Sequence, residues 1–321
     1  MKRALVLGAG GFIGSHVVKQ LKKEQFHVIG ADIKLPEFSP SAADEFLLGD
    51  LKDPQFVARI FNSTFDEVYQ FAADMGGAGY IFTGENDAQV MYNSALINLN
   101  VVHEFSKQKN GTIFFASSAC VYPEHNQLDA ANPNCREDSV YPANPDSDYG
   151  WEKLFSERLF QAFHRNEKMK VRIARLHNVF GTEGAWKGGR EKAPAALCRK
   201  VAMAANGSSI EIWGSGNQTR SFLYIEECLT GIRKLMDSDC KQVLNIGSNQ
   251  LISINDLAHM IIKISGKELS IKNIEGPTGV NGRNSDNSLI QRELNWQPTL
   301  PLQYGIEQLY WWIEKQVAET K

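Results

Sequence analysis

Short apolar runs alternate with longer amphipathic stretches through the first half of the chain. Rich in Val, Ile, Leu, Phe and Ala, the runs are typical of parallel strands covered on both faces. They occupy residues 4–7, 26–32, 67–73, 112–116 and 171–176. Stretches between them, such as 15–23 and 90–107, carry apolar residues at helical spacing. This alternation predicts an α/β fold with a doubly wound parallel sheet.

The alternation loosens after Gly181, where we expect the chain to leave the first domain. A basic, glycine-bearing loop at 185–196 leads into a helix, and residues 210–216 have the pattern of a strand followed by a turn. Residues 282–286 form a second basic, polar loop. These elements predict a smaller α/β domain toward the C-terminus.

A glycine-rich turn, Gly8-Ala-Gly-Gly-Phe-Ile-Gly14, joins the first predicted strand to the first helix. Glycines allow close backbone approach, and the helix N-terminus offers N–H groups to a pyrophosphate. Asp32 ends the second strand, where a carboxylate accepts a hydrogen bond from a ribose 2′-hydroxyl and repels a 2′-phosphate. The turn therefore predicts a dinucleotide site, and Asp32 favours NAD over NADP.

Tyr149 and Lys153 lie four residues apart on a predicted helix, so both project from one face. A neighbouring ammonium favours the phenolate, which predicts a Tyr149 pKa pulled down from ~10 toward neutrality, where the side chain can act as an acid/base. Asp146, Ser147 or Asp148 is available to cap this helix. Alone, the pair is also compatible with an exposed helix face, because a chain with nine tyrosines often carries such spacing by chance.

Two segments are expected at the carboxyl edge of the sheet, where doubly wound folds bind ligands. The glycine cluster 74–80 follows one strand, and Ser117, Ser118 and Cys120 follow another. We interpret 74–80 as a loop that approaches cofactor and substrate closely, with a flexible linker as the alternative.

Composition narrows the possible partners and locations. The 321 residues are 43% hydrophobic and 22% charged, as in an ordinary globular protein, and the net charge of −3 argues against nucleic-acid or membrane-surface binding. The apolar runs are too short to span a membrane, and the glycines after Leu7 argue against a signal peptide. Five cysteines without metal-type spacing indicate reduced thiols, no metal site and a cytoplasmic location.

Three motifs stand in the order found in extended short-chain dehydrogenase/reductases, the sugar-nucleotide-modifying type, which the whole chain resembles. They are the glycine turn, the run Phe115-Ala-Ser-Ser-Ala-Cys-Val-Tyr122 and Tyr149-Gly-Trp-Glu-Lys153. The resemblance implies a Rossmann-type NAD-binding domain of residues 1–180 plus about 219–250, and a sugar-nucleotide domain of about 181–218 plus 251–321. The cofactor-binding residues that it implies are Gly8, Gly11, Phe12, Ile13, Gly14, Asp32, Asp50, Leu51, Ala72, Ala73, Tyr149 and Lys153.

Within that family, four longer segments resemble the GDP-mannose 3,5-epimerase group: residues 72–79, 117–124, 186–195 and 282–287. The resemblance implies epimerisation of GDP-D-mannose at carbons 3 and 5, to GDP-L-galactose or GDP-L-gulose, through a transient 4-ketone. It also implies a tightly bound NAD that is regenerated in each turnover, and a homodimer. The chain departs from the group at His125-Asn126 and Thr182-Glu183.

The resemblance assigns roles to single side chains. Tyr149 removes the proton of the carbon-4 hydroxyl, Ser118 bonds the same oxygen, and Cys120 and Lys187 are acid and base on opposite faces of carbons 3 and 5. Without it, Cys120 would be interpreted as a small buried hydrophobe and Lys187 as a surface charge. The implied substrate-binding residues are Gly76, Gly77, Ser118, Asn178, Lys187, Lys192, Trp213, Arg220 and Arg283.

Some assignments keep alternatives. Arg220 and Arg283 could clamp the diphosphate or form surface ion pairs. His177 is expected to support a neighbouring site residue or to lie in the core, rather than to act as a base. GDP-4-keto-6-deoxymannose epimerase-reductase (GDP-fucose synthase) is the alternative enzyme, but it consumes NADPH, which Asp32 disfavours. A non-catalytic dinucleotide-fold protein need not keep Ser118 and Tyr149 together.

Overall fold

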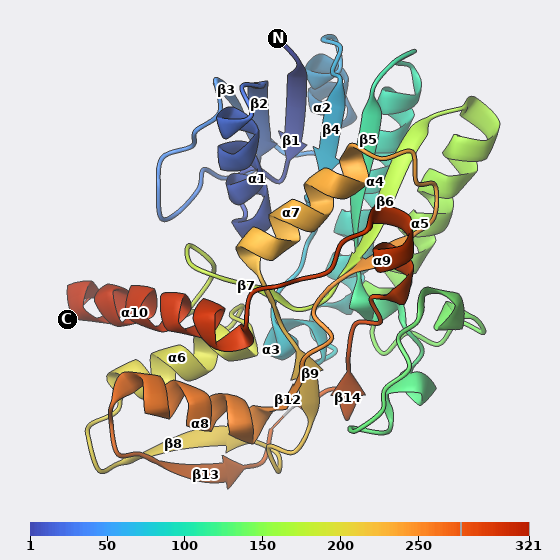
Figure 1. The fold of residues 1–321 in the computed structure, drawn as a ribbon. Helices are drawn as coiled ribbons and strands as arrows, with labels where there is room; N and C mark the ends of the chain where they lie inside the picture. Colours follow the sequence, from blue (N-terminus) through green and yellow to red (C-terminus); the bar gives the residue numbers. More distant parts are fainter. Residues whose placement is uncertain (277, 321) are drawn as a thin grey trace.

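The computed structural model describes residues 1–276 and 278–320, and its largest element is a seven-stranded sheet (Figure 1). The strand order is β11-β6-β5-β4-β1-β2-β3, with neighbours parallel throughout. This is a doubly wound order, which confirms the predicted fold class. The strands are β1 Arg3–Leu7, β2 His27–Asp32, β3 Glu45–Leu48, β4 Glu67–Gln70, β5 Thr112–Ser118, β6 Lys170–Leu176 and β11 Leu244–Ile246.

Helices cover both faces of the sheet. One face carries α1 Phe12–Lys23 and α7 Ile225–Met236. The other carries α2 Pro54–Ile60, α4 Asp87–Ser106 and α5 Asp148–Glu167. The loops at the carboxyl edge hold the short helices α3 Ala78–Ile81, η1 Ala119–Val121, η2 Glu124–Gln127 and η3 Glu137–Val140. Of the three candidate caps, Ser147 is the one used: its hydroxyl accepts from the Gly150 N–H at 3.3 Å.

The smaller part of the molecule lies below the sheet in Figure 1. It packs three helices together beside a two-stranded sheet: α6 Ala193–Met203, α8 Ile254–Ser265, α10 Leu302–Thr320, β8 Ser209–Trp213 and β13 Ser270–Ile274. Connections between the two parts include β7 Val179–Phe180, β10 Leu223–Tyr224, β9 Thr219–Ser221, β12 Leu251–Ser253, β14 Gly282–Arg283 and α9 Ser288–Leu294. Because β11 pairs with β6, the chain does return to the large sheet after its excursion.

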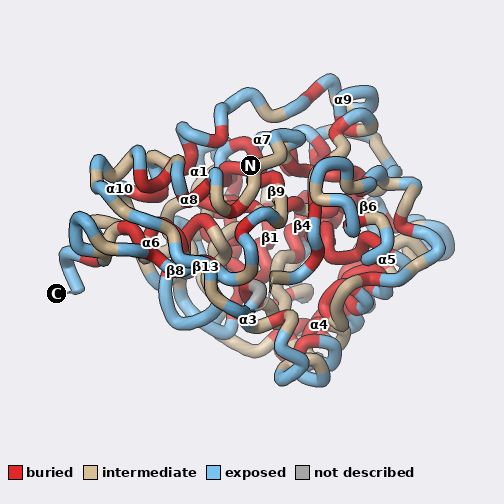
Figure 2. The backbone as a smooth tube through the Cα atoms, turned by 90° about the horizontal axis from the view of Figure 1, so that it is seen from below, coloured by how far each residue is buried: buried red, intermediate tan, exposed pale blue. Residues whose placement is uncertain are grey.

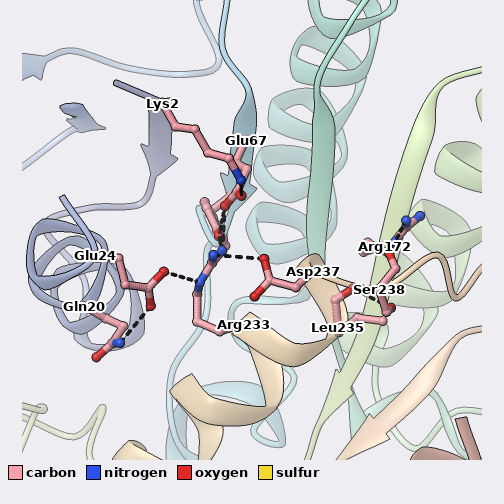
Figure 3. Close-up of polar contacts among 10 residues, drawn as sticks. Lys2, Gln20, Glu24, Glu67, Arg172, Arg233, Leu235, Asp237 and Ser238 are labelled. Carbon is pink, nitrogen blue, oxygen red and sulfur yellow. Dashed lines mark hydrogen bonds and ion pairs between the residues drawn. The ribbon is translucent and has the colours of Figure 1, made fainter. Parts of the chain in front are cut away.

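Arg233 connects α7 to β4 and to the end of α1 (Figure 3). Its guanidinium donates to Glu24, just after α1, at 2.9 Å and to Glu67 of β4 at 2.6 Å. It also contacts the hydroxyl of Tyr69 and pairs with Asp237 at 3.2 Å. Glu67 and Tyr69 are buried, and Arg233, with the more distant Lys2 at 3.7 Å, compensates the carboxylate. A partly buried charge network thus holds α7 in place.

Burial follows the predicted apolar runs. Figure 2 shows buried residues along the central strands and exposed residues along the outer loops. Ala4, Leu5, Val6 and Leu7 of β1 are fully buried, as expected for a strand covered on both faces. Among the described residues, no helix combines the length and apolar character needed to cross a membrane.

Candidate active site

The glycine turn after β1 has the shape that a dinucleotide pyrophosphate requires. Gly8 has a φ of +85°, and a Cβ on Gly14 would lie 2.1 Å from the carbonyl oxygen of Gly8. A Cβ on Gly10 would lie 2.0 Å from the carbonyl oxygen of Lys34. Gly11 caps α1 without a side-chain acceptor, so the N–H groups at the helix start, including those of Phe12 and Ile13, keep no side-chain partner there. The residues present therefore fit NAD.

Asp32 lies at the end of β2 beside this turn. Its carboxylate accepts from the N–H of Gly10 at 2.9 Å and of Lys34 at 3.2 Å, and burial raises its pKa. Each oxygen keeps a lone pair for a ribose hydroxyl. Gly49 donates its N–H to the Asp32 carbonyl at 2.9 Å, which brings the neighbouring Asp50 to the same edge.

The remaining predicted cofactor residues differ in exposure. Leu51 is buried, whereas Ala72 and Ala73 are half-buried after β4. Ala72 lies against the turn, because a Cβ on Gly8 would come within 2.7 Å of its nitrogen.

Lys153 and Tyr149 both point from α5 toward the end of β5. The ammonium of Lys153 donates to the carbonyl of Ala116 at 3.0 Å and lies 5.7 Å from the centroid of the Tyr149 ring. A Cβ on Gly150 would lie 2.1 Å from the carbonyl oxygen of Cys120. Only glycine therefore lets the first turn of α5 pack on η1, and this packing brings Tyr149 beside Cys120 and Ser118.

The expected fall in the Tyr149 pKa is not found in the protein. Burial raises the pKa of Tyr149 above its ordinary value, the charge of Cys120 adds to this, and the hydrogen bond with Ser118 opposes it. Burial likewise lowers the pKa of Lys153. The prediction was wrong because burial outweighs any effect of an ammonium that is directed at the Ala116 carbonyl.

Arg283 lies against Cys120. One guanidinium nitrogen, Nη1, donates to the Cys120 sulfur at 3.2 Å, and Nε donates to the side-chain oxygen of Gln127 at 2.6 Å. The third, Nη2, forms an ion pair with Asp146. The sequence analysis missed Gln127 and named Asp146 only as a possible helix cap, since no spacing links either residue to Arg283, more than 130 positions away.

Arg220 is held by its own surroundings. Its guanidinium donates to the carbonyls of Thr219, Thr278 and Val280 at 2.7, 3.1 and 2.7 Å. Burial lowers its pKa to about 10, and the charge of Arg283 acts in the same direction. Arg220 therefore lies near Arg283, and of these two candidate diphosphate ligands only Arg283 touches Cys120.

The two lysines of the basic loop have different environments. Lys187 is exposed, with its ammonium 4.8 Å from the centroid of the Trp186 ring. Lys192 is the N-cap residue of α6, and burial lowers its pKa. The charge of Cys120 is the next largest influence on Lys192 and opposes the effect of burial. Of the two, Lys192 is thus the one that the structure places within electrostatic reach of the thiol.

Two glycine-bearing loops meet above these side chains. The N–H of Gly77 donates to the carbonyl of Arg190 at 3.1 Å, and a Cβ on Gly77 would lie 2.3 Å from the carbonyl oxygen of Glu191. A Cβ on Gly76 would in turn lie 2.7 Å from that of Tyr80. The apolar residues on either side of this contact pack on Cys120 and Tyr149: Met75, Tyr80, Ile81 and Phe82. The segment 74–80 is therefore a loop packed against the candidate site rather than a flexible linker.

Three further residues named from the sequence lie near the junction of the two parts. Trp213 ends β8 with 41% of its surface exposed, and a Cβ on Gly276 would lie 2.6 Å from its ring. Asn178 donates to the carbonyl of Ser221 at 2.9 Å. His177 is fully buried against Asn245, and burial lowers its pKa to about 3, which fits a neutral core histidine.

Residues 4–247 match the NAD dependent epimerase/dehydratase family. The chain belongs to this family. A GDP-mannose 3,5-epimerase of Arabidopsis thaliana is 42% identical over 318 residues, which are 98% of this chain and 83% of that protein. A GDP-mannose 3,5-epimerase 1 of Oryza sativa subsp. indica is 42% identical over 321 residues, 99% of this chain and 83% of the relative.

The fold also matches that of solved epimerases. A UDP-glucuronic acid 4-epimerase from Bacillus cereus, solved with UDP-glucuronic acid and NAD, has a TM-score of 0.83 and 26% identity. The match covers 98% of this chain and 99% of that one. Family membership and the shape of the glycine turn together make NAD the cofactor, as predicted.

Proposed function

We propose that the protein is an isomerase that epimerises GDP-D-mannose at carbons 3 and 5 through a transient 4-ketone, giving GDP-L-galactose or GDP-L-gulose. Relatives with 42% identity carry the name of that activity. One observation carries the proposal: Cys120 lies beside Tyr149, in contact with a buried arginine. Oxidation and reduction at carbon 4 alone need no such thiol, whereas proton exchange at carbons 3 and 5 needs further acid/base groups.

Oxidation at carbon 4 uses Ser118, Tyr149 and Lys153. Tyr149 takes the hydroxyl proton, and because burial alone raises its pKa, its phenolate would need the positive charges of Lys153 and of bound oxidised NAD. Ser118 bonds the same oxygen, and the Ala116 carbonyl holds Lys153 in place. When bound, NAD would supply the hydride acceptor and donor at carbon 4 and would be regenerated in each turnover. The NAD would be held by Gly8, Gly11, Gly14 and Asp32, together with the segments near Asp50 and Ala72. The 4-ketone then acidifies the C–H bonds of carbons 3 and 5.

For the two acid/base groups at those carbons, we propose Cys120 and Lys192. The resemblance suggested Lys187, but we favour Lys192, because Lys187 is exposed whereas Lys192 is half-buried, burial lowers its pKa, and its charge interacts with that of Cys120. Lys187→Ala and Lys192→Ala separate the two assignments. The Lys192 variant should lose epimerisation by about a hundredfold or more, and the Lys187 variant should keep it within about tenfold. The reverse pattern would return the role to Lys187.

The diphosphate and base would lie toward the smaller part. Arg220 with Asn178 is our proposed contact for the diphosphate, and the exposed ring of Trp213 a platform for the base. Gly76 and Gly77 would let the loop 74–80 approach the sugar closely. Arg283 would contact the sugar end of the substrate rather than the diphosphate. The domain boundaries of the sequence analysis also stay a prediction, supported by the pairing of β11 with β6.

A homodimer is supported by the outer faces of α4 and α5, which pack side by side. Each carries exposed apolar side chains at helical spacing: Tyr92 and Leu99 on α4, and Trp151 and Phe155 on α5. A second copy of the same pair of helices would cover them, since such a patch is self-complementary across a two-fold axis. The cytoplasmic location stays a prediction, for which the five free cysteines are the support.

Product identity tests the proposal. Purified protein, incubated with GDP-mannose and no added cofactor, should form GDP-L-galactose or GDP-L-gulose as identified by proton NMR. If it instead consumed NADPH and reduced a 4-keto-6-deoxy sugar nucleotide without acting on GDP-mannose, the epimerase-reductase alternative would replace this one.

A further inference from the structure

We propose that Asp146 and Gln127 are positioning residues that aim the Arg283 guanidinium at Cys120 and so keep its sulfur as the proton acceptor, with Lys192 as the opposing donor. The reaction role of Cys120 rests on the proposed function, whereas the arrangement of these side chains does not. Neither residue need touch the substrate in this account.

Hydrogen bonds fix the guanidinium of Arg283 on two of its edges. Its side chain is buried, and each of its three guanidinium nitrogens has a different partner. Asp146 takes Nη2 and Gln127 takes Nε, which leaves Nη1 directed at the Cys120 sulfur. Since a guanidinium is a planar fork with fixed N–H directions, fixing two of its edges fixes the third. The contact with sulfur therefore follows from the other two.

The two partners of Arg283 are themselves fixed. The amide nitrogen of Gln127 donates to the carbonyls of Tyr122 and Pro123 at 3.0 and 3.2 Å, so its oxygen is turned to Arg283. Pro145, next to Asp146, forms an isolated bridge with Pro123, and this bridge ties the two loops together. Gln127 is fully buried, and only 5% of the Asp146 side chain is exposed. A buried scaffold thus determines where the guanidinium points.

The sulfur of Cys120 lies among cations. Arg283 donates an N–H to it, and other cations lie near. Burial lowers the pKa values of Lys153, Lys192 and Arg220, and the charge of Cys120 opposes that effect on all three. In the exchange step, a C–H bond of the sugar breaks as an S–H bond forms. On the opposite face an N–H bond of Lys192 breaks as a new C–H bond forms, so the protons balance.

Alkylation tests this without substrate. The NAD-loaded protein is treated with iodoacetamide at pH 7, and modification of each cysteine is followed by mass spectrometry. Asp146→Asn removes the charge that orients Arg283, so Cys120 should react about tenfold or more slowly, the worth of a hydrogen bond to a charged group. Half-buried Cys240 is the internal reference. Asp138→Asn, at an exposed ion pair with Arg136, makes the same charge change and should leave the Cys120 rate unaltered.

A double variant in which both charges are removed controls for misfolding of the single variant. Asp146→Asn leaves Arg283 buried without its counter-charge, whereas the double variant with Arg283→Gln leaves no buried charge unpaired. The double variant should also alkylate Cys120 about tenfold or more slowly. Cys120 that reacts no faster in the wild type than in a folded variant lacking the Asp146 charge would overturn the inference. A wild type that alkylates as expected but does not act on GDP-mannose would instead refute the proposed function alone.

Discussion

Replacing Gly150 with alanine should separate two groups on which the chemistry depends. The added Cβ would lie 2.1 Å from the carbonyl oxygen of Cys120 and 2.9 Å from the Cβ of Pro145. Ordinary contacts begin at 3.4 Å, so the first turn of α5 and η1 must move apart by about 1.3 Å. That movement carries Tyr149 away from Cys120, because the two residues lie on the two elements that meet at Gly150.

The size of the effect follows from this displacement. A misplacement of about 1 Å typically costs a hundredfold in rate, and overpacking of this kind costs roughly 1–3 kcal/mol of stability. We expect Gly150→Ala to fold, to unfold at a lower temperature, and to exchange solvent deuterium into the sugar about a hundredfold more slowly than the wild type.

The assay compares deuterium incorporation into GDP-mannose by wild type, Gly150→Ala and Asn166→Ala. Asn166 is exposed on the same helix, so its replacement by alanine changes α5 without adding an atom that could clash. Asn166→Ala should match the wild type. Exchange by Gly150→Ala within about threefold of the wild type would refute the argument that close packing of α5 on η1 sets the catalytic geometry.

Two predictions concern stability. Arg233→Met removes the nearer cation beside buried Glu67 and should lower the free energy of unfolding by about 3–5 kcal/mol in urea titrations. Arg136→Met, at an exposed ion pair, should change that free energy little. Equal effects of the two substitutions would contradict the stabilising role of the network in Figure 3. Because burial lowers the pKa of His177 from 6.5 to about 3, the unfolded chain binds a proton below pH 6.5 that the folded protein does not. Stability should therefore fall by about 1.4 kcal/mol per pH unit from pH 6.5 toward 3, and His177→Gln should lose that part of the slope; an unchanged slope would show that His177 is not the group responsible.

The fold could be predicted from the sequence because strands buried on both faces leave a strong apolar pattern. The runs at 4–7 and 112–116 became β1 and β5, and the glycine turn between β1 and α1 has the predicted shape. These features depend on neighbours within a few positions.

Features set by long-range packing could not be predicted in the same way. Spacing placed Lys153 near Tyr149 but gave no measure of burial, which proved larger than the charge effect. Lys187 and Lys192 occupy one loop without periodic structure, and contact with Gly77 fixes that loop from outside. Nothing local marks Asp146 as the partner of Arg283.

The label pattern in deuterated water tests the central claim most directly. The wild type, incubated with GDP-mannose, should place solvent deuterium at carbon 5 and, in the doubly inverted product, at carbon 3. Carbon 4 should keep its original hydrogen, because hydride returns there from the cofactor that removed it. Cys120→Ala and Lys192→Ala should each reduce the labelling about a hundredfold. Label at carbon 4 alone, or wild-type exchange in both variants, would contradict an epimerase that works through Cys120 and Lys192.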